Sequence, residues 1–169
     1  MSAFFDGLLH PLLAPAHLLA LIGLGLLIGQ RRKGLRLLPS LAFATGLIGG
    51  LAALTYGIGE TPAGNVLLAS AVVTGLCVAF VAPVPMFLVA ALAIVVGVAI
   101  GIDSPPHALS LDAANLALMG TWLGACVLFA ICAAAAALAA RPWHRIALRV
   151  LASWTAASAI LVLALRLVK

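Results

Sequence analysis

Two histidines near the start of the chain are the residues best suited to chemistry. His10 and His17 enclose the stretch HPLLAPAH, which also contains Pro11 and Pro15. Imidazole nitrogen is a common metal ligand, and its charge changes near neutral pH. On a straight helix, seven residues would separate the two side chains by about 10 Å along the axis, too far for one metal ion. We expect Pro11 to begin a helix, leaving His10 outside it, and Pro15 to bend the next turn, so that His10 folds toward His17.

A purely structural interpretation of these histidines stays open. In that interpretation His10 lies at a membrane interface and His17 hydrogen-bonds to a neighbouring helix. Both interpretations place the histidines in a membrane protein, because the 169 residues are 66% hydrophobic and only 8% charged, with a mean hydropathy of +1.30. Soluble domains are about half apolar and a quarter charged.

The composition predicts an all-α, polytopic transmembrane helix bundle that forms one integral membrane domain over residues 1–169. A helix needs about 20 apolar residues to cross a bilayer. Charged, proline-rich or glycine-rich breaks divide the chain into six expected spans. They cover residues 8–29, 37–56, 66–82, 84–102, 115–140 and 146–168.

The charges predict the orientation of these spans. Seven of the nine Lys and Arg residues follow the first or the fifth span, at Arg31, Arg32, Lys33, Arg36, Arg141, Arg145 and Arg149. The exceptions are Arg166 and Lys169. Since basic residues mark cytoplasmic loops, both termini are expected outside. The net charge of +5 then reflects topology, and we expect no nucleic-acid partner. The first segment is expected to stay as a helix; the alternative is a longer precursor whose N-terminal signal was removed.

Pairs of glycines four residues apart indicate close helix packing. They are Gly25 with Gly29, Gly46 with Gly50, Gly97 with Gly101, and Gly120 with Gly124. Such pairs let helix backbones approach each other in lipid, where no hydrophobic effect drives helices together.

The first span also resembles a known family. GLLHPLLAPAHLLALIGLGLLI is similar to the first helix of the HupE/UreJ family, small proteins of the bacterial inner membrane that are regarded as nickel or cobalt permeases. The family motif is His, five residues, then Asp-His; here His10 and five residues precede Ala16 and His17. LPSLAFATGLIGG and PAGNVLLASAVVTG are similar to the second and third helices of the family, with Asn65 where the family usually has Glu.

A second family motif is altered in this chain. The family has Phe-His-Gly-x-Ala-His-Gly-x-Glu, and the equivalent VVGVAIGID has Val96 and Ile100 in place of the histidines and Asp103 in place of the Glu. The resemblance therefore implies a reduced metal-ligand set of His10, His17 and Asp103. From their types and positions alone, Asp6, Glu60, His107 and Asp112 are candidates for an outer funnel that guides the metal, and a solvated loop is the alternative interpretation of His107. No resident cofactor is expected, since Ni²⁺ or Co²⁺ would be the transported ion.

Two functions remain open at this point. The retained histidines favour uptake of a divalent metal, which would fall at acid pH because protonated imidazole does not bind metal. The lost ligands favour a degenerate, non-transporting member that serves as an accessory or structural subunit of a membrane complex. Assembly with other membrane proteins or with further copies of the chain is compatible with both. An enzyme is not expected, because the sequence offers no nucleophile with a base and no pair of carboxylates for acid–base catalysis.

Overall fold

The computed structural model describes residues 3–56, 63–106 and 110–167, and helices account for nearly all of these residues. No strand occurs in these three ranges, so the predicted all-α membrane bundle is confirmed. The helices are α1 (Ala3–Leu13), α2 (Pro15–Gly29), α3 (Leu37–Thr55), α4 (Ala63–Ala79), α5 (Met86–Ile102), α6 (Leu111–Ala137) and α7 (Pro142–Leu167), with a short 3₁₀ turn η1 (Lys33–Leu35).

Length and composition qualify several of these helices as membrane spans. Lys33–Leu54, Leu111–Ala137 and Pro142–Arg166 are each long and apolar enough to cross a bilayer. The bent pair α1 and α2 qualifies as a fourth span if it is counted as one. Helices α4 and α5 are equally apolar but have 17 residues each, about 25 Å of helix. The six-span arrangement therefore stays an expectation for these two shorter helices.

The first expected span is not one continuous helix. It is broken at Ala14, which has an extended backbone with φ −85° and ψ 111°, and α1 and α2 meet there at 69°. A residue before proline is driven from the helical to the extended region, and Pro15 follows Ala14. The expectation that Pro11 begins the helix was wrong: Pro11 lies inside α1, and His10 belongs to that helix.

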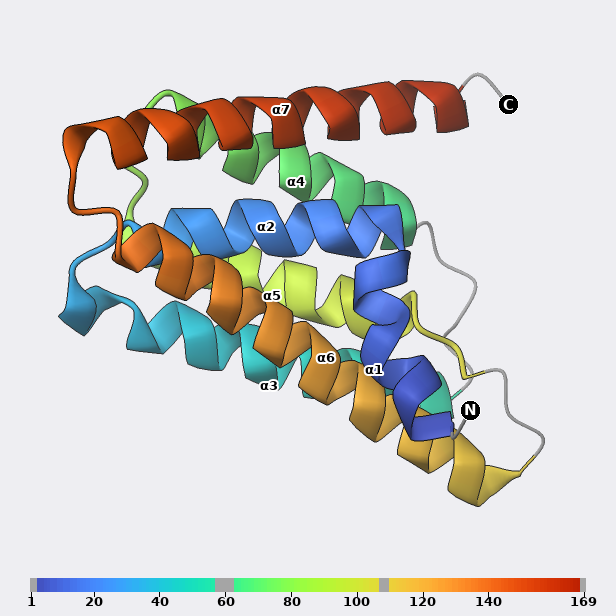
Figure 1. Ribbon diagram of the computed structural model, residues 1–169. Helices are drawn as coiled ribbons and strands as arrows, with labels where there is room; N and C mark the ends of the chain where they lie inside the picture. Colours follow the sequence, from blue (N-terminus) through green and yellow to red (C-terminus); the bar gives the residue numbers. More distant parts are fainter. Residues whose placement is uncertain (1–2, 57–62, 107–109, 168–169) are drawn as a thin grey trace.

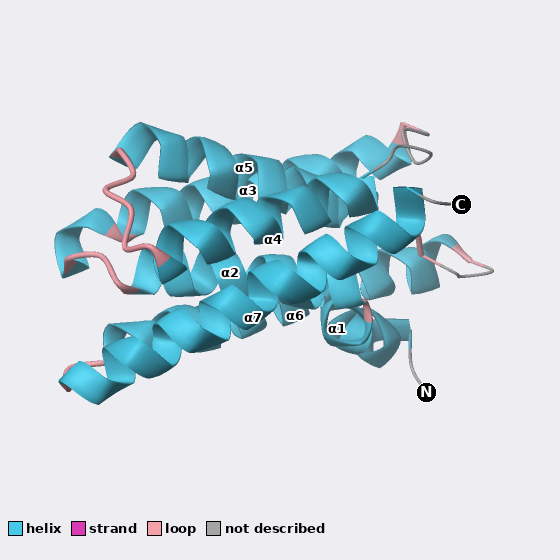
Figure 2. Cartoon of the chain, turned by 90° about the horizontal axis from the view of Figure 1, so that it is seen from above, coloured by secondary structure: helices cyan, strands magenta, loops and turns pink. Residues whose placement is uncertain are grey.

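Helix α2 runs through the middle of the bundle, with α4, α6 and α7 around it (Figures 1 and 2). Most of its side chains are buried, from Ala16 to Ile28. The other large contacts join α3 to α5, α1 to α6, and α4 to α7. Because α2 contacts helices from both halves of the chain, a side chain in its first turn can meet residues that are distant in sequence.

The glycine pairs lie where two helices come closest. A Cβ on Gly46 would lie 2.7 Å from the Ile94 carbonyl oxygen, and one on Gly101 would lie 2.5 Å from the Leu51 nitrogen. Gly50 and Gly97 face the partner backbone in the same α3–α5 contact. Gly120 and Gly124 face the backbone of α1 at Phe4 and Leu8. No side chain fits at these positions unless the backbones move apart.

The two ends of the bundle carry opposite kinds of charge. Helix α1 begins and α7 ends at the same end of the molecule (Figure 1), where α5 also ends at Asp103. The α2–α3 and α6–α7 connections lie at the other end, with five basic residues, and the first turns of α7 add Arg145 and Arg149 there. We call these the acidic end and the basic end.

Candidate functional site

The bend between α1 and α2 brings the two histidine rings together. The ring centroids of His10 and His17 are 5.1 Å apart, with the planes at 74°. A metal–nitrogen bond of about 2 Å places each ring centre about 3 Å from the ion, so two imidazoles on one ion have centroids about 4.5–6 Å apart. The spacing of these rings therefore suits two ligands of one ion, and the bend that brings them together lies at Ala14, directly before Pro15.

His17 is held in place by an acidic residue from the far half of the chain. Its side chain is fully buried in the first turn of α2. Its Nε2 lies 3.0 Å from Oδ2 of Asp103, a residue that directly follows α5. An ionised carboxylate only accepts hydrogen bonds, so His17 Nε2–H donates to Asp103. The positive end of the α2 dipole also favours a carboxylate here.

The second ring nitrogen of His17 has no such partner. Nδ1 is buried and makes no hydrogen bond to any residue that the structure describes. When a neutral ring carries its proton on Nε2, Nδ1 has a free lone pair. A histidine that binds a metal through one nitrogen usually gives the other N–H to a carboxylate or carbonyl. The His17–Asp103 pair therefore has the arrangement of a ligand with its supporting acid.

The three expected ligands form two pairs that share His17. His10 contacts its ring, and Asp103 contacts its Nε2. Among the residues described in 3–56, 63–106 and 110–167, no three His, Cys, Asp or Glu side chains converge as a ready-made metal site. The two altered motif positions, Val96 and Ile100, are fully buried apolar side chains of the core. Protein atoms alone therefore offer fewer donors than a closed metal site requires.

A cavity of about 300 Å³ leads toward His10 from the acidic end. Its wall includes Asp6 and His10, together with the hydroxyl-bearing Ser104 and Thr121. Both hydroxyls donate to carbonyls four residues earlier: Ser104 to Ile100 in the last turn of α5, and Thr121 to Ala117 within α6. Two members of the expected funnel, Glu60 and His107, lie outside the described residues. The remaining member, Asp112, is exposed in the first turn of α6 and does not line this cavity.

Arg166 is a neighbour of this site that the sequence did not predict. Its Nη1 occupies the space where a side chain at Gly64 would begin, and a Cβ on Gly64 would lie 3.5 Å from Asp103 Oδ2. The last turn of α7 thus brings a guanidinium close to the carboxylate that holds His17. A signal was present in the sequence, because Arg166 is one of two basic residues that depart from the charge pattern.

The chain matches the sequence model of one protein family, described as HupE / UreJ protein, over residues 1–163. No curated protein and no solved structure matches it.

Proposed function

The chain belongs to the HupE/UreJ family, and from that premise we propose that it takes up a divalent metal ion, nickel or cobalt, through the bend between α1 and α2. The family consists of membrane proteins of the nickel and cobalt transporter type and is not an enzyme family, in agreement with the multi-pass helical fold. One observation carries the proposal: the His10 and His17 rings lie 5.1 Å apart beside a carboxylate-supported His17.

The described residues suggest a path for the ion. Asp6 attracts the cation into the cavity at the acidic end, and His10 receives it there. His17 then binds it through Nδ1, while Asp103 keeps the ring oriented through Nε2. Two imidazoles and water would complete the coordination, since nickel and cobalt accept nitrogen and oxygen ligands. We assign Asp103 the role of orienting His17, and not that of a third ligand.

We also propose that the acidic end faces outward from the bacterial inner membrane. The basis is the excess of Arg and Lys at the opposite end, which is typical of the cytoplasmic side. In this orientation the cavity beside His10 opens to the external medium and the ion enters from there.

Metal binding by purified protein tests the proposal. We expect measurable Ni²⁺ or Co²⁺ binding near neutral pH and none in His17→Ala. The triple variant Ala16→Asp, Val96→His, Ile100→His should bind more tightly than the parent, because it restores the donors that the family motif has. Uptake into proteoliposomes, with His144→Ala as a control histidine at the basic end, then separates transport from binding. Equal binding by the parent and His17→Ala would reject the site.

The buried Val96 and Ile100 favour the second candidate function. Both side chains are fully buried, so the part of α5 that carries histidines in the family is apolar and without metal-binding side chains at these two positions in this chain. If the parent and the triple variant both fail to bind metal, a role as a non-transporting subunit of a membrane complex is the better explanation. Co-purification of the chain with a stable membrane partner would then support that role.

A further inference from the structure

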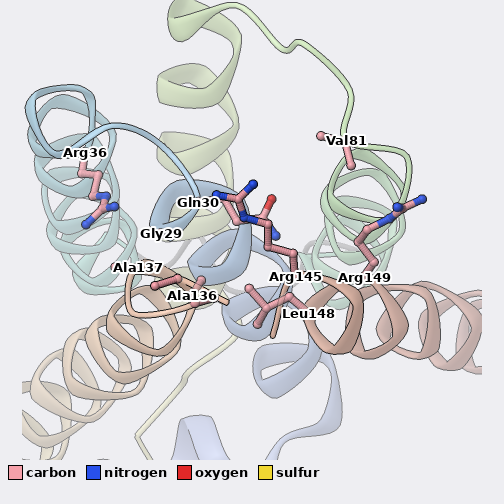
Figure 3. Close-up of a pocket in the computed structure, with 11 residues that line it drawn as sticks. Gly29, Gln30, Arg36, Val81, Ala136, Ala137, Arg145, Leu148 and Arg149 are labelled. Carbon is pink, nitrogen blue, oxygen red and sulfur yellow. The ribbon is translucent and has the colours of Figure 1, made fainter. Parts of the chain in front are cut away.

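A second cavity lies at the basic end, far from the histidines. It has a volume of about 460 Å³ and opens where α2 and α6 end and α7 begins. Its walls include Gln30, Arg36, Val81, Arg145, Leu148 and Arg149 (Figure 3). The volume is within the range of small-molecule sites. Three arginines around one cavity suit an anion with several oxygen atoms.

The described protein does not neutralise these arginines. The sequence has four acidic residues, Asp6, Glu60, Asp103 and Asp112. The three described ones belong to the acidic end, and the ion pair found among described residues, His17 with Asp103, is also there. The guanidinium groups at the cavity therefore need an anion from outside the chain.

Hydrogen bonds to helix ends account for part of the arginine cluster. Arg149 Nε donates to the Ala79 carbonyl at 2.8 Å, and Arg36 Nε donates to the Arg31 carbonyl at 2.6 Å. Capping of this kind is common at helix C-termini. It fixes each side chain through Nε and leaves the two Nη groups available. Arg145 makes no side-chain hydrogen bond to any residue in the described ranges, and Figure 3 shows it beside Gln30 at the centre of the cavity, between Arg36 and Arg149.

One wall of the cavity is apolar and includes an unusual backbone. Val81 has a φ of +54°, in the left-handed region where a β-branched residue is rare. It ends α4 with a Schellman motif, in which Ala82 N–H donates to the Cys77 carbonyl and Val81 N–H to that of Val78. The strained turn places Val81 among the residues that line the cavity, as Leu148 does from α7. Arginines and apolar side chains around one cavity match an amphiphilic ligand.

We propose that this cavity binds the phosphate group of an anionic phospholipid. The bilayer-spanning helices end at the level of the cavity, which is the depth of lipid headgroups. Arg145 would contact the phosphate directly, with the Nη groups of Arg36 and Arg149 on either side. Val81 and Leu148 would contact the glycerol and the start of the acyl chains. Basic pockets between helices at this level bind anionic headgroups in membrane proteins generally. The proposal does not depend on metal transport.

Lipid titration of the delipidated full chain in detergent tests it. Phosphatidylglycerol should bind saturably, as followed by native mass spectrometry and by a rise in Tm, while phosphatidylcholine should not. Arg145→Gln should weaken phosphatidylglycerol binding by about fivefold or more. Arg32→Gln is the matched control, because Arg32 is an exposed arginine at the same end that does not line the cavity. The control should bind phosphatidylglycerol as the parent does.

Several outcomes would overturn the proposal. If Arg32→Gln weakens binding as much as Arg145→Gln, only the overall positive charge matters. If inorganic phosphate at millimolar concentration gives the same rise in Tm and displaces the lipid, the ligand is a free phosphate. Arg145→Lys covers the case in which Arg145→Gln does not fold: it keeps the charge but loses the two-pronged guanidinium, and we expect intermediate affinity. Affinity of Arg145→Lys equal to that of the parent would contradict a two-pronged contact between the guanidinium and the phosphate.

Discussion

Removing the charge of Arg166 is expected to strengthen metal binding at the bend between α1 and α2. The guanidinium lies against Gly64, close to Asp103, whose carboxylate holds His17 at 3.0 Å. A fixed positive charge at this place raises the free energy of a divalent ion that reaches His17. It also competes for the negative charge of Asp103. Arg166→Gln removes both effects and keeps a side chain of similar length.

The size of this effect follows from Coulomb's law. Because the ion on His17 Nδ1 lies on the far side of the ring from Asp103, we take a separation from the guanidinium of about 9 Å, at which two unit charges repel by about 0.5 kcal/mol in water and about 1.8 kcal/mol at an effective dielectric constant of 20. The Arg166 side chain is exposed, so the lower end of this range applies. A divalent ion doubles the repulsion to about 0.9 kcal/mol, which is about fivefold in Kd. We expect Arg166→Gln to lower the Kd for Co²⁺ by about this factor, and we expect the gain to shrink in 1 M salt.

Calorimetric titration with Co²⁺ at low salt measures the change. Arg32→Gln removes the same charge at the opposite end of the bundle and should leave Kd unchanged. Gly64→Ala should act in the same direction as Arg166→Gln, because its methyl group displaces the flexible end of Arg166 without altering any charge. A Kd of Arg166→Gln within about twofold of the parent, or an equal gain in Arg32→Gln, would refute the reasoning. If the parent does not bind, the same comparison is made in the triple variant.

Three further predictions concern the scaffold. Gly97→Leu should prevent folding or assembly, because even a Cβ at this position meets the backbone of α3. Val95→Leu, on the exposed side of α5, should be tolerated. Equal yields of folded protein from the two variants would contradict this prediction. Val81→Gly should raise Tm, because relief of the left-handed backbone strain is worth about 1 kcal/mol. The Val81 side chain is exposed, so its removal gives up little buried apolar surface. A lower Tm would show that the contacts of this side chain outweigh the strain. In a variant with the native cysteines replaced, an impermeant outside reagent should label cysteine at Ser110 and not at Gly34, and the reverse result would invert the proposed orientation.

Composition and proline positions predicted the helices and the bend at Pro15, but not where the first helix begins. The extended backbone at Ala14 follows from its position before Pro15. Pro11 was misleading, because proline is favoured in the first turn of a helix and also tolerated where packing compensates. Here α1 extends back to Ala3 because it packs closely along α6, where Gly7 lies directly against the backbone at Ala117. That contact joins residues far apart in sequence, and no local pattern contains it.

The candidate site shows the same limit. The types and spacing of His10 and His17 identified them as candidates, but the Asp103 hydrogen bond links residues 86 positions apart. The resemblance named Asp103 as a ligand, and only the three-dimensional arrangement shows that it contacts His17 Nε2. Arg166 stood out in the sequence as an exception to the charge pattern. Its proximity to Asp103 depends on the packing of α7 against α4, where Gly64 leaves room for the guanidinium.

The burial of His17 provides a way to separate the two candidate functions. A buried imidazole with no partner on Nδ1 costs folding about 1–3 kcal/mol relative to a fully bonded or apolar side chain. Leucine would fill a similar volume without that cost, and Asp103, which is partly exposed, could then be hydrated or contact Arg166. If His17 serves metal uptake, His17→Leu should keep or raise Tm in detergent while binding and uptake are lost. If His17 is a packing residue only, His17→Leu should leave metal binding and uptake unchanged. A stable His17→Leu protein with unchanged metal uptake would contradict the proposed site.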